Sequence, residues 1–227
     1  MKKLFLALFL VGMLTSSTAF ILHNNINMSS KNKITQPTKN VNDNIQMIYS
    51  DADFDKNYNS IEDLSKDADI IIQGVVLKVS YFDYNIETYT KSQVKVTKSY
   101  SKNIKEGDIL TFTEIGGITT QKNFVKALSK KSAKFSQYVE HATDKPIKRV
   151  LCGADVMQPN QQVLLFATKS TILPENPYVP LGAFQGKFLI NGTSISRIKN
   201  NDEKSIIPLN FNKAVIDQKI QAAIKIK

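Results

Sequence analysis

Cysteine is almost absent from this sequence, which contains a single one, Cys152, among its 227 residues. One cysteine cannot form a disulfide within the chain, so the folded part must be held together by its core alone. Cys152 also lies far from the amino-terminal apolar segment, whereas a bacterial lipoprotein carries its modified cysteine directly after such a segment. Lipid anchoring through Cys152 is therefore excluded.

Histidine is nearly as rare, because the sequence holds only His23 and His141. A zinc site needs three or four nitrogen, sulfur or carboxylate ligands, and neither C-x-x-C nor H-E-x-x-H occurs, so we predict no metal and no cofactor. A thiol enzyme built on Cys152 needs a base, and His141 is the candidate. Cysteine is among the residue types most often buried, so we interpret Cys152 as structural and keep the pair Cys152 and His141 as the catalytic alternative.

Other ligand motifs are missing as well. Gly116-Gly117 lacks the Lys-Ser or Lys-Thr of a phosphate loop. Zinc-finger, helix-turn-helix and aromatic RNA-binding motifs are not found, so no nucleic-acid partner is expected. Carboxylates for a hydrolase are available, but nothing in the sequence selects two of them: Glu87, Glu106, Glu114 and Glu140.

The chain begins with a basic and then apolar segment, "MKKLFLALFLVGMLTSSTAF". Two lysines, an apolar run over 4–14 and a small-residue site at 17–19 are typical of a secretory signal peptide, predicted here over 1–19. The protein is then secreted or located at an extracytoplasmic cell surface. The alternative is an uncleaved anchor over 4–22, just long enough for a hydrocarbon core of ~30 Å, which would tether the protein to the membrane.

Basic residues exceed acidic ones by 30 to 20, which makes the formal net charge +10. Removal of residues 1–19 takes away two lysines and no acid, so the charge falls to +8. In an exported protein this excess favours attraction to anionic cell-wall polymers, lipid headgroups or an acidic extracellular protein.

Composition divides the remaining chain into three parts. Residues 20–49 are rich in asparagine and lack apolar periodicity, so they are predicted to form a disordered tether. Residues 50–209 are predicted to form one domain, and residues 210–227 a C-terminal amphipathic helix whose apolar side contains Val215 and Ile216.

Strand patterns dominate the predicted domain. A short helix capped by Ser60 precedes a run rich in Ile and Val over 70–84, in which Gly74 indicates a bend. Residues 88–100 alternate between polar and apolar, as a half-buried strand does. Further strands are predicted over 109–117, 161–170, 182–190 and 193–198, with Asn191-Gly192 as a hairpin turn.

Residues 119–148 interrupt these strands with a lysine-rich helical pattern that Pro146 would end. One interpretation is a helix that docks on an anionic surface while Phe124 and Leu128 dip into it. The other, which we favour, is a helix that closes one end of the barrel, because a barrel core needs the same apolar stripe. The candidate binding residues are Lys122, Lys126, Lys130, Lys131, Lys134 and Phe135.

Together these patterns predict a mostly β protein with helices, of α+β class. The order of strands and the helix after the third strand favour a small Greek-key barrel of the oligonucleotide/oligosaccharide-binding (OB) type, with an inserted basic helix over 119–148 and a C-terminal amphipathic helix.

The segments "IEDLSKDADIIIQGVVLKVS", "NQQVLLFATKS" and "LGAFQGKFLI" resemble small, mostly uncharacterised exported proteins of Gram-positive bacteria, over roughly 61–190. Their G..qGkf ending is matched by residues 182–188. The layout is more distantly similar to the netrin-like barrel of tissue inhibitors of metalloproteinases, but the chelating amino-terminal cysteine and the disulfides of those inhibitors are missing. The resemblance implies a barrel in an extracytoplasmic setting and leaves the activity open.

The leading hypothesis is therefore a non-enzymatic cell-surface protein that binds anionic wall or membrane components. The alternatives are a wall-acting enzyme, using either Cys152 and His141 or paired carboxylates, and an inhibitor of an extracellular hydrolase. Neither the ligand nor the oligomeric state follows from the sequence.

Overall fold

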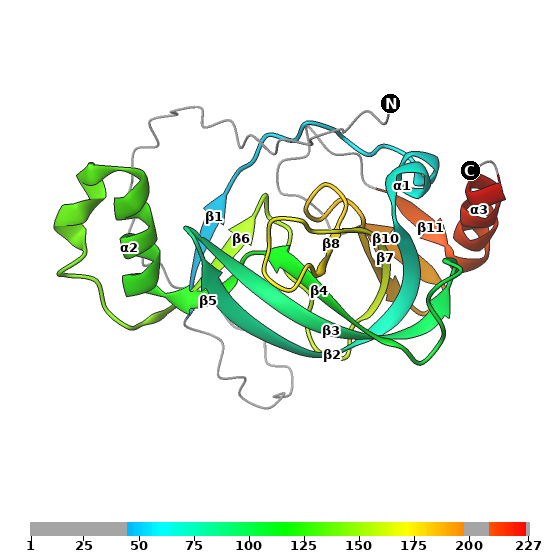
Figure 1. Ribbon diagram of the computed structural model, residues 1–227, viewed down its shortest axis with the longest axis horizontal. Helices are drawn as coiled ribbons and strands as arrows, with labels where there is room; N and C mark the ends of the chain where they lie inside the picture. The colour runs from blue at the N-terminus through cyan, green and yellow to red at the C-terminus, as the bar shows by residue number, and fades with distance from the viewer. Residues whose placement is uncertain (1–44, 198–208, 226–227) are drawn as a thin grey trace, which may run out of the picture. The chain divides into compact units, whose positions relative to one another are not determined.

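The computed structural model describes residues 45–197 and 209–225 (Figure 1). The predicted signal segment, most of the predicted tether and His23 lie outside the described residues. The elements in chain order are β1 (Gln46–Ser50), α1 (Ile61–Asp67), β2 (Ile70–Tyr84), β3 (Glu87–Ser99), β4 (Ile109–Ile115), β5 (Gly117–Thr120), α2 (Gln121–Lys131), the 3-10 helix η1 (Ala133–Tyr138), β6 (Pro146–Leu151), β7 (Gln162–Lys169), β8 (Tyr178–Pro180), β9 (Lys187–Asn191), β10 (Ser194–Arg197), β11 (Asn210–Asn212) and α3 (Lys213–Lys225).

Five strands close into a barrel in the order β2-β3-β4-β8-β7 and back to β2. Closure depends on β8, which pairs in parallel with β4 at Phe112 and Tyr178 and antiparallel with β7. Three antiparallel neighbours in sequence followed by a crossover to a parallel partner make a Greek-key barrel of the OB type. The predicted OB-like α+β fold is confirmed.

The first barrel strand follows the sequence pattern closely. Ser60 accepts a hydrogen bond from the backbone N–H of Asp63 and so begins α1 as predicted. β2 then spans Ile70–Tyr84, and its pairing with β3 shifts register at Gly74. A Cβ at Gly74 would lie 2.5 Å from Val94 Cγ1 and 2.7 Å from the Lys95 carbonyl oxygen. Only glycine lets the two strands approach this closely at the bend.

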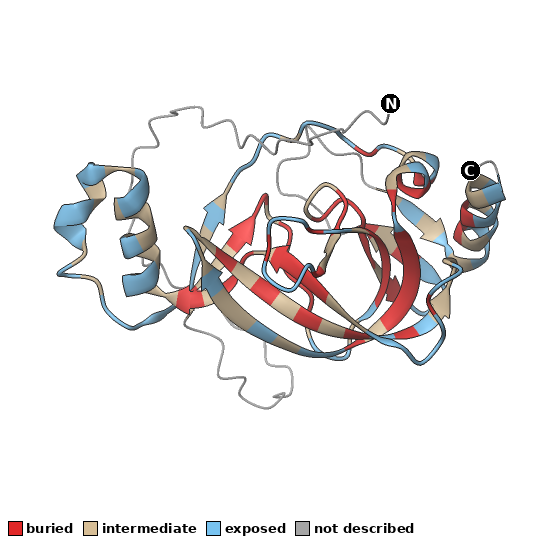
Figure 2. Ribbon diagram, in the orientation of Figure 1, coloured by how far each residue is buried: buried red, intermediate tan, exposed pale blue. Residues whose placement is uncertain are grey.

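Two hydrophobic cores lie on opposite faces of the curved sheet (Figure 2). The barrel interior is filled by aliphatic residues of β2, β3 and β7 around Phe112. On the outer face of β7 and β9, α1 and α3 cover a second core that includes Phe166 and Phe188, whose ring centroids are 5.8 Å apart. The two helices therefore stabilise the sheet from the side that carries Ile71, Phe166 and Phe188.

A buried ion pair joins β4 and β9, two strands that are not neighbours in the sheet. Lys187 at the start of β9 is 1% exposed and its ammonium contacts the carboxylate of Glu114 on β4, which is 4% exposed. Lys187 Nζ also donates to the Asp155 carbonyl oxygen at 2.7 Å, and the Met157 N–H donates to Glu114 Oε2 at 2.9 Å. The added hydrogen bonds satisfy both charges inside the fold.

The neighbouring residues of the "GAFQGKF" segment are also structural. Gln185 is fully buried, accepts a hydrogen bond from the Tyr58 N–H at 2.7 Å and donates to the Lys56 carbonyl oxygen at 3.2 Å. A Cβ at Gly186 would lie 2.3 Å from the Phe166 carbonyl oxygen. Residues 182–188 therefore have a structural role: they connect β9 to the segment before α1 and pack closely against β7.

The inserted segment is not helical throughout, and the predicted bounds of 119–148 are wrong at both ends. Residues 117–120 form β5 and residues 146–151 form β6, which pair with each other and, through β6, with β1 in a separate three-stranded sheet. Pro146 begins a strand here. Because proline lacks an N–H, it cannot continue a helix at this position. It is tolerated at the first residue of a strand, so β6 can begin here.

The predicted tether is too long at its carboxyl end. Residues 46–49 belong to β1, which pairs in parallel with β6 from Gln46 to Ser50. The apolar run of Met47, Ile48 and Tyr49 supplies the side chains for this pairing, which an asparagine-rich composition concealed.

The C-terminal helix α3 is shorter than predicted, because residues 210–212 form β11. Ile216 and Ile220 are buried, but Val215 is 45% exposed, contrary to the predicted apolar side. A polar cluster also holds α3: Asp217 accepts hydrogen bonds from Lys98 Nζ at 2.8 Å, from Gln73 Nε2 at 3.1 Å and from the Tyr100 hydroxyl. Burial raises the pKa of Asp217, but the hydrogen bonds from Lys98 and Tyr100 outweigh it and leave the pKa lowered.

The buried ion pair yields a stability prediction. Lys187→Met leaves the Glu114 carboxylate buried without its counter-charge, and should lower the free energy of unfolding by about 3–5 kcal/mol. The double variant Lys187→Met with Glu114→Leu removes both charges and should recover most of this loss. Urea denaturation of the three proteins measures both effects. A double variant as unstable as the single variant would contradict the assignment.

The Asp217 cluster predicts a pH-dependent attachment of α3. Because the folded pKa of Asp217 is lowered, its contribution to stability is present at neutral pH and is lost as the pH falls below about 4. Asp217→Asn should destabilise the protein at neutral pH and make little difference at about pH 3. Thermal unfolding at the two pH values tests this. Glu106→Gln, in the exposed loop before β4, is the control and should change neither.

Candidate functional site

The inserted helix α2 lies outside the barrel. The Thr120 hydroxyl accepts a hydrogen bond from the Asn123 N–H and caps the helix, which ends before Ser132. α2 has no buried residue, and Figure 1 places it at the end of the domain away from α1 and α3. The interpretation that this helix closes the barrel is therefore wrong. The core of the barrel interior is formed by strand residues around Phe112 and by Ile104 and Met157, and none of its residues comes from α2.

The predicted binding residues all lie on α2 or η1. The five lysines are exposed and Phe135 is half-buried. Lys134 Nζ lies 5.1 Å from the centre of the Phe135 ring, within the range of a cation–π contact. The structure thus brings together these side chains: Lys122, Lys126, Lys130, Lys131, Lys134 and Phe135.

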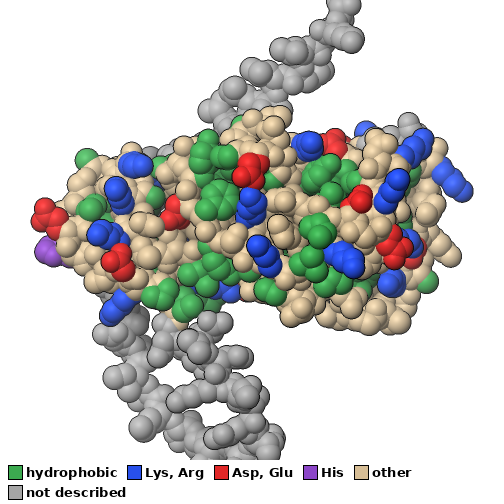
Figure 3. All heavy atoms as spheres, turned by 60° about the horizontal axis from the view of Figure 1, so that its bottom comes forward, with side chains coloured by type: hydrophobic (Ala, Val, Ile, Leu, Met, Phe, Trp, Pro, Cys, Tyr) green, Lys and Arg blue, Asp and Glu red, His purple; other side chains and the backbone are tan. Residues whose placement is uncertain are grey.

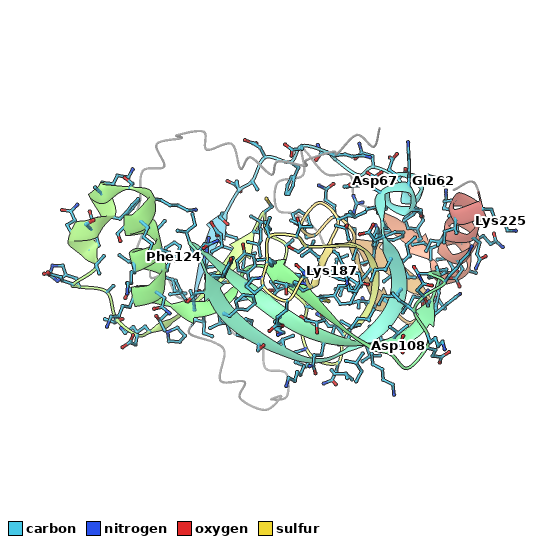
Figure 4. All side chains as sticks on the ribbon, in the orientation of Figure 1. Glu62, Asp67, Asp108, Phe124, Lys187 and Lys225 are labelled. Carbon is cyan, nitrogen blue, oxygen red and sulfur yellow. The ribbon has the colours of Figure 1, made fainter. Side chains whose placement is uncertain are left out.

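One carboxylate attaches α2 to the β2–β3 hairpin. Glu87 Oε1 is 2.8 Å from Lys131 Nζ of α2, and Glu87 Oε2 is 2.8 Å from Arg149 of β6. The Arg149 guanidinium also lies 5.3 Å from the centre of the Phe124 ring. Figure 4 shows Phe124 on the side of α2 that faces the hairpin. Lys131 is thus engaged within the protein, unlike the other predicted binding lysines of α2.

A second carboxylate, Asp83 at the end of β2, strengthens this attachment. Its Oδ1 accepts a hydrogen bond from the Thr88 hydroxyl at 2.8 Å. Its Oδ2 accepts from the Thr119 hydroxyl and from Asn123 Nδ2, each at 2.9 Å. Asp83 and Glu87 therefore serve to position the insert, which is held by polar contacts.

An open cleft of about 420 Å³ separates α2 from the hairpin. Asp83, Glu87 and Arg149 lie along it. Glu87 and Arg149 form a salt bridge with each other, and Asp83 accepts a hydrogen bond from Thr119. Lys126 and Lys130 line the helix side, and within the described part of the chain neither forms a salt bridge. The cleft therefore carries two lysines that form no salt bridge among the described residues, one helical turn apart, which could contact an anionic group.

Cys152 and His141 occupy different surroundings. Cys152 is 6% exposed and belongs to a small apolar cluster with Leu151, Ala154 and Phe184, so its predicted burial is confirmed. It has a positive φ of 48° at the end of β6. His141 is exposed in the segment between η1 and β6.

The four glutamates considered for a hydrolase also differ in burial and in their ion-pair partners. Glu114 is buried against Lys187 and Glu87 is paired with two cations, while Glu106 and Glu140 are exposed. Within residues 45–197 and 209–225, no group of three or more His, Cys, Asp or Glu side chains is arranged to hold a metal ion. None of the helices in these two ranges is long and apolar enough to cross a bilayer.

The polar attachment of α2 can be tested with Glu87→Gln. Loss of the charge that joins Lys131 and Arg149 should weaken the attachment by about 1 kcal/mol, so α2 amides should exchange hydrogen about fivefold faster. Amides of β2 and β7 should be unchanged. Glu140→Gln, on the exposed segment after η1, provides the control. Equal exchange rates in both variants would show that Glu87 does not hold the insert.

Three comparisons with known proteins were made. No protein-family model, no curated protein and no solved structure matches this chain.

Proposed function

We propose that this chain is an exported cell-surface binding protein that docks through its inserted helix on an anionic wall or membrane surface. The proposal rests on two observations. α2 contributes no buried residue to the fold. Lys126 and Lys130 line an open cleft and form no salt bridge among the described residues. Surface lysines on a helix that the core does not require are free to contact a partner.

The charge of the protein supports the same proposal. A net charge of +8 after removal of the predicted signal peptide raises the local concentration of the protein near a polyanion and accelerates encounter. The predicted signal segment would bring the domain to the compartment in which anionic wall polymers and lipid headgroups are exposed. The attachment of α2 through Glu87 and Asp83 gives its lysines a defined orientation.

Binding to purified wall polymer and to vesicles containing phosphatidylglycerol tests the proposal. Each lysine near an anionic surface contributes about 1 kcal/mol, so Lys126→Gln with Lys130→Gln should weaken binding about 30-fold at low salt. The matched control is Lys66→Gln with Lys225→Gln, which removes two exposed lysines from α1 and α3.

High salt should abolish the difference between the cleft variant and the parent protein, because exposed charges are screened. Binding that is insensitive to salt, or lost equally in the control variant, would rule out docking through α2.

A further inference from the structure

The outer face of β2, β3 and β4 carries an apolar and basic patch that no described helix covers. The strand register defines its rows: Val75 pairs with Lys95, and Lys95 with Ile109; Lys78 pairs with Gln93, and Gln93 with Thr111. Side chains of residues paired in this way lie on the same face of a sheet. Together with Leu77, these residues form the sheet patch: Val75, Leu77, Lys78, Gln93, Lys95, Ile109 and Thr111.

A β-bulge determines the composition of the sheet patch. The pairing of β2 with β3 shifts between Val76 and Lys78, so Leu77 is the additional residue. Val76 is fully buried in the barrel, whereas Leu77 is 43% exposed and Lys78 is exposed. A regular strand would turn every second residue inward, but the bulge presents two consecutive residues outward. The leucine is therefore held outward by the register of the strand.

The sheet patch combines exposed aliphatic groups with lysines. Ile109 is 57% exposed and lies directly across from Lys95, with Leu77 and Lys78 on the adjoining strand. The patch contains no acidic residue. Asp108 adjoins it at the rim, where its carboxylate accepts a hydrogen bond from the Lys105 N–H at 2.8 Å. Figure 3 turns the side of β2 and β3 toward the viewer and shows hydrophobic and basic side chains next to each other there.

The geometry excludes several kinds of occupant. β3 is paired on both sides, with β2 and β4, so an extended peptide cannot add to the sheet beside Gln93 and Lys95. Two copies meeting through the same patch would bring Lys78 and Lys95 of one copy against the lysines of the other. A soluble polyanion could contact the lysines, but it offers no apolar surface against which Leu77 and Ile109 could be buried.

We propose that the sheet patch docks on an anionic lipid surface, with Leu77 and Ile109 entering the boundary of the acyl region and Lys78 and Lys95 contacting lipid phosphates. Aliphatic groups surrounded by lysines are the combination that binds the interface of an anionic bilayer. The proposal extends the proposed function, since it adds a second contact and specifies a lipid partner, but it rests on residues outside α2.

Vesicle sedimentation with the full chain tests the sheet patch. Leu77→Ser with Ile109→Ser should lower the partition coefficient onto phosphatidylcholine vesicles containing phosphatidylglycerol about tenfold, at low and at high salt. Lys78→Gln with Lys95→Gln should lower it about 30-fold at low salt only. Val215→Ser is the control, because Val215 is 45% exposed on α3, and should have no effect. Thermal unfolding of each variant checks that the fold is retained.

The outcomes separate the two proposals. If Leu77→Ser with Ile109→Ser binds vesicles like the parent protein, the sheet patch is not a lipid contact, even where Lys126→Gln with Lys130→Gln shows that α2 docks. If the Leu77 and Ile109 double variant loses vesicle binding and the Lys126 and Lys130 double variant does not, the lipid contact is made by the sheet patch alone. Tight binding to soluble polyglycerol phosphate that depends on Leu77, or a dimer dissolved by Leu77→Ser, would overturn the lipid assignment.

Discussion

The buried contact between Lys187 and Glu114 is the interaction on which the packing of β9 against the barrel strand β4 depends. β9 and β4 are not neighbours in the sheet, so no backbone hydrogen bonds hold them together there. The ion pair bridges them, and the Asp155 carbonyl and the Met157 N–H complete the hydrogen bonds of both charged groups. Burial of two charges costs several kcal/mol for each ion, and only such a complete set of partners offsets that cost.

The inserted helix takes no part in this buried packing. α2 contributes no buried residue and is attached to the domain through Glu87 and Asp83. An element excluded from the core keeps its lysines available to solvent. The same holds for the outer face of β2, β3 and β4 around Leu77 and Ile109, since α3 reaches this sheet only at Gln73 and Lys98 among the described residues.

Elements whose pattern is local could be predicted closely. Ser60 capping of α1 requires residues three positions apart, and β2 is rich in Ile and Val, so both signals are local in the sequence. Elements that need a partner were missed. β1, β5 and β6 are short, and each becomes a strand only because one of the others lies beside it. The bulge at Leu77 was likewise not predicted, because it arises from the pairing with β3.

The sequence by itself determined the class of fold, the alternation of β3 and the amphipathic, lysine-rich character of α2, because these follow from propensity and periodicity along the chain. It also limited the chemistry, through a single cysteine and two histidines. Only the tertiary structure decided that Lys187 in "GAFQGKF" meets Glu114, and that α2 stands outside the core. Both depend on which side chains from distant parts of the chain pack together, and that packing cannot be predicted from any local pattern.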